Sequence, residues 1–274
     1  MARTSKKGKG EMPQELRHRL STAKEKEALR IINAMDPPCE SGRGRPRMPA
    51  ENALRATLYI ARTGVPWRDL PKERFGCWQT VYGWFRKWLA MGVFEAISGL
   101  RQGKAAFAYG QTCSIDSTAC KAHKSAFGAR KGSPGPIGQC ISAGRGGSGT
   151  KIHVVSCDGR PIAYALSGAA SSDAGQAAAL AVQPEYMGMF LNADRAYLSE
   201  LLRAAVHDRS GILNVPAKSN TLKPIEHDPE IYKLRSEAEM LFGRIKEFRR
   251  VATRYDKLAR VFEGFFLLSC VYYF

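Results

Sequence analysis

KIHVVSCDGRPIAYAL, residues 151–166, contains two short runs of alternating apolar and polar residues on either side of Asp158-Gly159. An Asp-Gly pair between two such runs predicts a β-hairpin, because both residues tolerate the left-handed backbone conformation of a tight two-residue turn. Upstream, QTCSIDST (residues 111–118) alternates in the same way and predicts a further strand. The sequence therefore predicts three consecutive strands.

Helices and strands alternate after this hairpin. The sequence predicts a helix that begins near Ser172 or Asp173, a strand MFLNAD that ends at Asp194, a helix over residues 196–208, a strand in GILNVP and a long helix from about residue 229. Three strands followed by βα units give a mixed sheet flanked by helices. The predicted fold class is α/β, and the element order is similar to the ribonuclease-H-like fold.

The first part of the chain is predicted to be helical. Residues 1–13 predict a disordered basic tail, and helices are predicted over 14–34, over 50–62 and from near Trp78. The third helix places apolar residues at helical spacing, which we expect in the core: Trp78, Val81, Tyr82, Phe85, Trp88 and Leu89. Arg86 and Lys87 would project outward. This pattern is typical of a small all-α, helix-turn-helix-like domain that binds DNA; an ordinary helical bundle is the alternative.

The chain is strongly basic. Its 274 residues include 42 Lys+Arg and 25 Asp+Glu, a formal net charge of +17. Such an excess favours a polyanionic partner, a merely basic protein being the alternative. Arg43, Arg45 and Arg47 in the linker ESGRGRPRMP could lie along a DNA groove or simply be solvated. The Gly- and Ser-rich residues 124–149 are predicted to form a mobile loop, whose bases could contact phosphate, or a plain connector.

Seven cysteines occur without a C-x-x-C pair, so neither a zinc ribbon nor a disulfide framework is indicated, which fits a reducing cytoplasm. The basic start has no apolar segment after it, so no signal peptide is expected. The final FEGFFLLSCVYYF is too short to span a bilayer and is expected to dock on the core.

Two aspartates occupy positions where chemistry is expected. Asp116 lies inside a predicted strand, where Asp is disfavoured. Asp194 ends a strand, and open α/β sheets place their ligands at strand carboxyl ends. The alternative for Asp194 is a cap of the 196–208 helix. Asp158 is explained by its turn, and Asp173 and Asp228 by helix caps.

Residues 232–250 have the sequence YKLRSEAEMLFGRIKEFRR. Drawn as one helix, this segment places its charged side chains on two separate sides of the apolar face. At about 100° per residue, Arg235, Glu239 and Lys246 form one polar column, and Glu237 lies on the opposite edge of the apolar face. That face contains Leu234, Ala238, Leu241, Phe242, Ile245 and Phe248. By periodicity alone, Arg235 and Glu239 are an ordinary ion pair one turn apart.

Tyr232, Arg235, Glu239 and Lys246 match the Y-x2-R-x3-E-x6-K signature of bacterial insertion-sequence transposases, with every spacing kept. SIDST and NADRAY resemble the segments that hold this family's other two acids. RTGVPWRDLP, WQTVYGWFRKW and GSGTKIH are similar to the insertion-sequence-five-like branch, so the resemblance covers roughly residues 15–274.

The resemblance implies a DDE transposase in which Asp116, Asp194 and Glu239 bind two divalent ions, Mg²⁺ or Mn²⁺, about 4 Å apart. Arg235 and Lys246 would neutralise phosphate charge near the reacting bond, and Tyr232 could contact the DNA end, a packing role being the alternative. It implies a DNA-binding domain over 14–105 and a catalytic domain over 106–274. The expected partners are the terminal inverted repeats, target DNA and a second copy of the chain, at the nucleoid in the cytoplasm, with no membrane.

Two other functions stay open beside this one. The chain could be a degenerate or domesticated copy that only binds DNA, or a ribonuclease-H-like nuclease that cuts without joining. His123, seven residues after Asp116, is expected to have a structural or DNA-contacting role.

Overall fold

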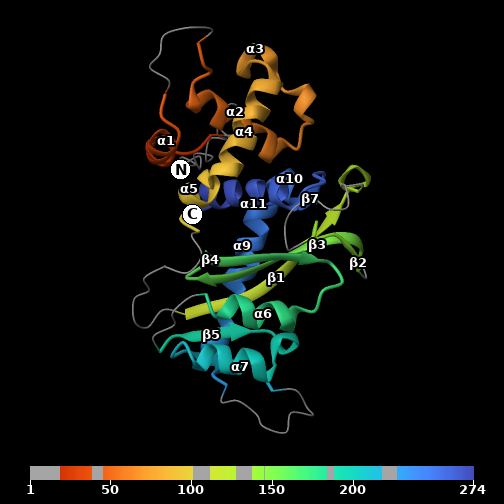
Figure 1. Ribbon diagram of the computed structural model, residues 1–274. Coiled ribbons are helices and arrows are strands. Elements are labelled where there is room, and N and C mark those ends of the chain that lie inside the picture. The colour runs from red at the N-terminus through yellow and green to blue at the C-terminus, as the bar shows by residue number, and fades with distance from the viewer. Residues whose placement is uncertain are drawn as a thin grey trace, which may run out of the picture.

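The computed structural model describes residues 19–38, 46–100, 112–127, 138–144, 146–183, 188–217 and 227–274. Its centre is a seven-stranded mixed sheet (Figure 1). The strands are β1 (Thr112–Ala122), β2 (Ser142–Gly144), β3 (Gly147–Cys157), β4 (Arg160–Gly168), β5 (Phe190–Ala193), β6 (Ile212–Asn214) and β7 (Thr253–Arg254). The predicted α/β fold with a mixed sheet flanked by helices is confirmed.

The sheet has an antiparallel and a parallel half that meet at β1. On one side β3 pairs antiparallel with both β1 and β4, and on the other β5 pairs parallel with β1 and with β6. Short β2 extends the pairing of β3, and β7 pairs with the end of β1. The main order β4-β3-β1-β5-β6 is that of the ribonuclease-H-like fold.

The predicted hairpin is the β3–β4 connection. Asp158 and Gly159 have φ of 48° and 69°, the left-handed values that a type I′ turn needs. The meander is therefore fixed by a local signal, because the turn type sets the register of the strands that it joins.

Helices cover both faces of the sheet, and each face has its own core. On one face lie α6 (Asp173–Ala181) and α7 (Glu200–His207), which pack over Ile115, Val155 and Leu191. On the other lie α8 (Pro229–Lys233), α9 (Ser236–Lys246), α10 (Arg249–Ala252) and α11 (Ala259–Tyr273). Figure 1 shows α9 and α11 between the sheet and the N-terminal helices.

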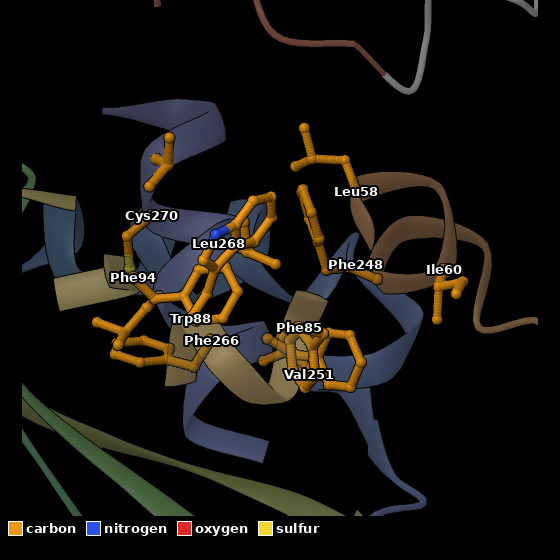
Figure 2. Close-up of a cluster of buried hydrophobic side chains, with 14 of the residues drawn as sticks. Leu58, Ile60, Phe85, Trp88, Phe94, Phe248, Val251, Phe266, Leu268 and Cys270 are labelled. Carbon is orange, nitrogen blue, oxygen red and sulfur yellow. The ribbon is translucent and has the colours of Figure 1, made fainter. Parts of the chain in front are cut away.

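The N-terminal helices are α1 (Thr22–Met35), α2 (Ala50–Thr63), α3 (Lys72–Phe75), α4 (Trp78–Met91) and α5 (Val93–Ser98). They share one hydrophobic core with α9, α10 and α11. Figure 2 shows Leu58, Phe85 and Trp88 gathered with Phe266 and Leu268 of α11. Burial of such aromatic and aliphatic side chains contributes about 1.5–3 kcal/mol each, so the two ends of the chain stabilise one another.

Several predicted helix boundaries were wrong. The described part of the first helix begins at Thr22, where Ser21 caps it, instead of residue 14. The 196–208 helix is a 3₁₀ turn, η3 (Arg195–Tyr197), followed by α7, which Ser199 caps. Residues 64–77 between α2 and α4 contain a 3₁₀ turn, η1 (Trp67–Asp69), and α3, so this connection is longer than the short turn of a simple helix-turn-helix.

The buried face predicted for the third helix is largely correct. Val81, Phe85, Trp88 and Leu89 are buried in α4, and Trp78 and Tyr82 pack partly buried against the same core. Trp84, which was not predicted, is also buried. Within the described ranges, no helix is both long enough and apolar enough to cross a membrane.

The segment predicted as a loop over residues 124–149 contains regular secondary structure. It contains a 3₁₀ turn, η2 (Lys124–Ala126), then β2 and the beginning of β3. Residues 128–137 and 145 lie outside the described residues. The predicted domain boundary near residue 105 also falls outside them and stays a prediction.

Candidate active site

The register of β1 and β5 places Asp116 beside Asp194. Ile115 of β1 pairs with Ala193 of β5; Asp116 directly follows Ile115, and Asp194 directly follows Ala193. Ile115 and Ala193 are fully buried in the core under α6 and α7. Because side chains alternate along a strand, Asp116 faces the other side of the sheet, where α9 packs on β1.

Asp116 accepts two hydrogen bonds. Its Oδ1 accepts from the backbone N–H of Ser117 at 2.8 Å, and its Oδ2 accepts from Nη1 of Arg235 at 2.7 Å. Burial raises the pKa of Asp116 above its ordinary value, and the negative charge of Asp194 adds to this, outweighing the two hydrogen bonds. The site therefore concentrates negative charge where water is partly excluded.

Arg235 joins two of the predicted acids. Besides Asp116, its guanidinium donates from Nη2 to Oε1 of Glu239 at 3.0 Å. The side chains of Arg235 and Asp116 are 19% and 18% exposed, whereas that of Glu239 is 63% exposed. Burial lowers the pKa of Arg235, but the negative charge of Asp116 and the other neighbours outweighs it, so the pKa is raised overall.

The helix that supplies these residues is interrupted, which corrects the prediction of one long helix from residue 229. It breaks at Leu234 and Arg235, where hydrogen bonds join residues three apart in place of four. Leu234, predicted to be buried, is exposed. Ala238, Leu241, Phe242, Ile245 and Phe248 are buried as predicted.

The other residues of the signature surround the same strand. Lys246 Nζ donates to the carbonyl of Ala119 on β1 at 3.0 Å. Tyr232 packs edge-on against the ring of His227, with centroids 5.1 Å apart. Glu237 lies beside the β3–β4 turn, where a Cβ on Gly159 would be 3.8 Å from its Cβ. The structure thus separates Glu237 from the Arg235–Glu239 pair.

The alternative assignment of Asp194 as a helix cap was wrong. It precedes η3, its side chain makes no capping hydrogen bond there, and α7 is capped by Ser199. Asp228 does cap α8, as predicted, because its Oδ1 accepts from the backbone N–H groups of Glu230 and Ile231. Among the described contacts, the side chain of Asp194 therefore does not cap a helix.

Asp173 has a larger role than the predicted cap. It is the first residue of α6, with Ser172 at the cap position. Its Oδ1 accepts from Nζ of Lys151 at 3.0 Å and from the hydroxyl of Ser117 at 3.2 Å. Ser117 follows Asp116 on β1, so this cluster supports the strand from the face opposite the acids.

Sequence reasoning missed this cluster and its buried histidine. His153 lies 3.8 Å from Asp173 and is fully buried. Burial lowers its pKa to about 4, so it is neutral near pH 7. The available signal was the alternation itself: Ser117 pairs with His153 across β1 and β3, and Lys151 is two positions along on the same face.

The basic residues of the N-terminal part that were predicted to bind DNA differ in whether they are exposed or already bind a carboxylate. Arg86 is exposed on α4. Lys87 and Arg47 both bind the buried carboxylate of Asp36, at 2.7 and 2.5 Å, and the guanidinium of Arg47 stacks on Trp84. Burial opposes ionisation of Asp36, but hydrogen bonds to these cations lower its pKa. Arg43 and Arg45 lie outside the described residues.

Residues 110–274 match the family model described as "Transposase DDE domain", and residues 26–98 match "Putative transposase of IS4/5 family". A ribonuclease-H-like sheet with one acid within β1 and another just after β5 fits an enzyme that acts on nucleic acid. The chain belongs to the DDE transposases of insertion sequences related to the IS4/5 group.

Two relatives that are named as putative transposases agree with this family, and a third relative is uncharacterised. The chain is 33% identical over 133 residues to a "Putative transposase for insertion sequence element IS402" of Burkholderia cepacia, which covers 44% of the chain and 61% of that protein. It is 30% identical over 125 residues to the corresponding protein of element IS6501 of Brucella ovis, covering 44% and 94%. An uncharacterised protein of Sinorhizobium fredii is 35% identical over 104 residues, covering 38% and 80%.

Proposed function

We propose that this chain binds the ends of its insertion sequence and catalyses metal-dependent cleavage and strand transfer of DNA. The observation that carries the proposal is the position of Asp116 and Asp194, each one residue beyond the paired Ile115 and Ala193 of β1 and β5, with Arg235 linking Asp116 to Glu239. A family match alone gives an enzyme that acts on DNA, whereas this arrangement supports particular residues for the chemistry.

The three acids fit a divalent cation. Their carboxylate oxygens are the ligands that Mg²⁺ and Mn²⁺ prefer, and Asp116 and Glu239 already converge on a positive group, the guanidinium of Arg235. Within the described ranges, no three potential metal-binding side chains stand close enough to hold an ion in the present arrangement. In our proposal Arg235 gives up Asp116, and Glu239 turns inward.

Two divalent ions held by these acids would supply activation of the attacking oxygen and stabilisation of the leaving oxygen. The protein's own contribution is charge and position. Asp116, Asp194 and Glu239 would hold the cations, and Ser117 orients the Asp116 carboxylate through its backbone N–H. In this proposal Arg235, once released, and Lys246 neutralise the phosphate next to the scissile bond. Tyr232, whose hydroxyl interacts electrostatically with Arg235, is proposed to contact the DNA end.

The basic N-terminal helices are proposed to hold the DNA. Residues 14–105 would form this DNA-binding part and residues 106–274 the catalytic part. Arg86 is exposed for a phosphate contact, and Arg43 and Arg45 are proposed to follow the groove. Lys87 and Arg47 would contribute after exchanging Asp36 for phosphate. Two DNA ends must be handled together, so we propose a homodimer on DNA, at the nucleoid in the cytoplasm.

The competing proposal is a copy that binds DNA without cutting it. The intact trio of Asp116, Asp194 and Glu239 favours the enzyme. A strand-transfer assay tests this, with Mg²⁺ and a duplex that carries the DNA flanking the gene. Asp116→Asn and Glu239→Gln should abolish joining but leave binding intact, whereas Glu237→Gln, the matched control on the same helix, should retain joining. Joining by Asp116→Asn at the wild-type rate would overturn the metal-site assignment; nicking without joining would indicate a nuclease.

A further inference from the structure

The exposed residues of α4 form one continuous face. At about 100° per residue they fall within an arc of about 120°. The residues are Gln79, Thr80, Gly83, Arg86, Lys87 and Ala90. The rest of the circumference holds the side chains that α4 packs into the core shared with α9, α10 and α11, so the exposed face points away from that core.

The charges on this face lie near its two edges. Arg86 is at one edge of the arc, and Lys87 is about 100° away near the other. The exposed residues between these two cations are uncharged: Gln79, Gly83 and Ala90. The sequence of α4 contains no Asp or Glu. Cations on both sides of an uncharged strip are complementary to a DNA groove, in which two phosphate backbones flank the base edges.

A hollow of about 290 Å³ adjoins the Lys87 edge of the face. Its lining residues are Arg47, Thr80, Gly83, Trp84 and Lys87. Arg47 and Lys87 share the single carboxylate of Asp36, so the three side chains leave one net positive charge. The guanidinium of Arg47 stacks on Trp84 at 3.7 Å, which holds it at this edge. The hollow therefore suits a phosphate group beside α4.

Gly83 stands at the centre of the face, and nothing in the packing of the protein requires a glycine there. A Cβ built on Gly83 meets nothing within 4 Å, and its φ lies outside the left-handed region. A glycine within a helix is destabilising relative to alanine. What it provides is the absence of a side chain, which lets the helix backbone approach a partner closely. Gly83 therefore marks the point of closest approach.

The shape and chemistry of the face favour a duplex over a single strand. The major groove of B-DNA is about 12 Å wide and admits an α-helix. Single-strand sites stack bases on aromatic side chains, and the exposed residues of α4 include none. Gln79 lies on the uncharged strip, and its amide can form two hydrogen bonds with the major-groove edge of adenine. Its Oε1 now accepts from the thiol of Cys77, a weak donor that a base can replace.

We propose that α4 lies in the major groove of double-stranded DNA, with Gly83 at the closest approach and Gln79 contacting an adenine. Arg86 and Lys87 then contact phosphates on the two sides of the groove. The inference rests on the proposed function, since the duplex is the end of the insertion sequence, and it adds which residue reads the bases.

Gly83→Gln fills the centre of the face and leaves the fold intact. Gly175→Gln in α6 is the matched control, because Gly175 is also an exposed helical glycine whose Cβ would meet nothing within 4 Å. The sheet separates α6 from α4 (Figure 1). Both changes replace a helical glycine by a better helix former, so each should raise the unfolding temperature by about 1–3 °C.

The binding experiment measures fluorescence anisotropy of the full chain with three labelled probes of equal length. They are a duplex of the DNA flanking the gene, a duplex of shuffled sequence, and one strand of the first duplex. Gly83→Gln should weaken binding to both duplexes about tenfold and leave single-strand binding unchanged, and Gly175→Gln should change none of the three affinities. Stability and duplex affinity would thus move in opposite directions for Gly83→Gln alone.

Two further variants separate base contacts from phosphate contacts. Gln79→Ala should lower the ratio of the affinities for the flanking and the shuffled duplex about tenfold. Arg86→Gln should weaken both duplexes alike and reduce the slope of log affinity against log salt by about 0.9.

Duplex binding by Gly83→Gln at the wild-type affinity would overturn the proposal, as would an equal loss in Gly175→Gln or an equal loss of single-strand binding. An unchanged ratio in Gln79→Ala would overturn the base contact. The strand-transfer assay is run in parallel on the wild type. Joining by the wild type together with unchanged duplex binding by Gly83→Gln would reject the α4 interface and keep the proposed function. A wild type that neither cuts nor joins, while the variants bind as expected, would reject the proposed chemistry and keep the interface.

Discussion

Replacing Arg235 with Gln should tighten divalent-cation binding while it slows strand transfer. Arg235 donates to Asp116 at 2.7 Å and to Glu239 at 3.0 Å, so a cation must displace it from both carboxylates. The same guanidinium is proposed to stabilise phosphate charge during the reaction. Its removal therefore changes the two measurements in opposite directions.

The two ion pairs contribute unequally. Both side chains of the Arg235–Asp116 pair are about four-fifths buried, so their charge-assisted hydrogen bond contributes about 1.5–3 kcal/mol. Glu239 is 63% exposed, and its pair with Arg235 contributes only about 0.3–0.5 kcal/mol after solvent screening. Loss of the competition at Asp116 should thus tighten cation binding roughly tenfold to a hundredfold, since about 1.4 kcal/mol corresponds to a factor of ten.

Calorimetric titration with Mn²⁺ and Mg²⁺, and the shift of the unfolding temperature with cation concentration, measure this affinity without any DNA. Arg244→Gln, an exposed arginine of the same helix, is the matched control and should leave the affinity unchanged. Asp194→Asn in the Arg235→Gln background should abolish binding. If Arg235→Gln bound the cation no more tightly than wild type, Arg235 would not compete for these carboxylates and our reasoning would be refuted.

Three further predictions concern the scaffold around this site. His153 has a pKa of about 4 in the folded chain and an ordinary pKa near 6.5 in the unfolded chain, so between these pH values only the unfolded chain binds the proton. The free energy of unfolding should therefore fall by about 3 kcal/mol as the pH drops through this window. Urea unfolding of His153→Asn should lack that loss, and an equal loss in both proteins would exclude His153 as the cause. Gly64→Ala should destabilise the chain by about 1–3 kcal/mol in thermal unfolding, because φ of Gly64 is +75° and the new Cβ would lie 2.9 Å from the Cβ of Arg249. The control Gly175→Ala, in α6 with open space around it, should leave stability unchanged or raise it. Asp36→Asn should lower stability by about 1–2 kcal/mol yet strengthen duplex binding, because it frees the two cations that it binds; unchanged binding would show that those cations do not reach DNA.

Local patterns in the sequence were sufficient to predict the five main strands and the positions of Asp116 within β1 and Asp194 at the end of β5, but not the short strands β2 and β7. The Asp158-Gly159 turn fixes the β3–β4 register, and alternation places Asp116 within β1. These signals depend on neighbours in the chain, which is why they survive in the fold. The signature residues could be related to Asp116 and Asp194 only through a family resemblance, because the Arg235–Asp116 contact joins residues 119 positions apart.

The break between α8 and α9 could not be predicted from periodicity, because contacts from the sheet decide it. Asn192 on β5 donates to the carbonyl of Ile231, and Asn214 on β6 donates to that of Asp228. Both asparagines are buried, so these hydrogen bonds are costly to lose and they hold α8 on the strand ends. A helix continued straight through Leu234 would lose this attachment, and the chain bends there instead.

The shared core has a consequence for how DNA binding and catalysis are joined. Phe85 of α4 stacks on Phe265 of α11 with ring centroids 4.9 Å apart, and a Cβ on Gly264 would lie 2.6 Å from the Leu89 side chain. Phe248 and Val251, just after α9, belong to the same core. Since packed interiors transmit small displacements, the helices proposed to hold DNA and the helix that carries Glu239 are positioned by one set of contacts. If these helices hold DNA as proposed, this packing sets the orientation of the DNA relative to the acids.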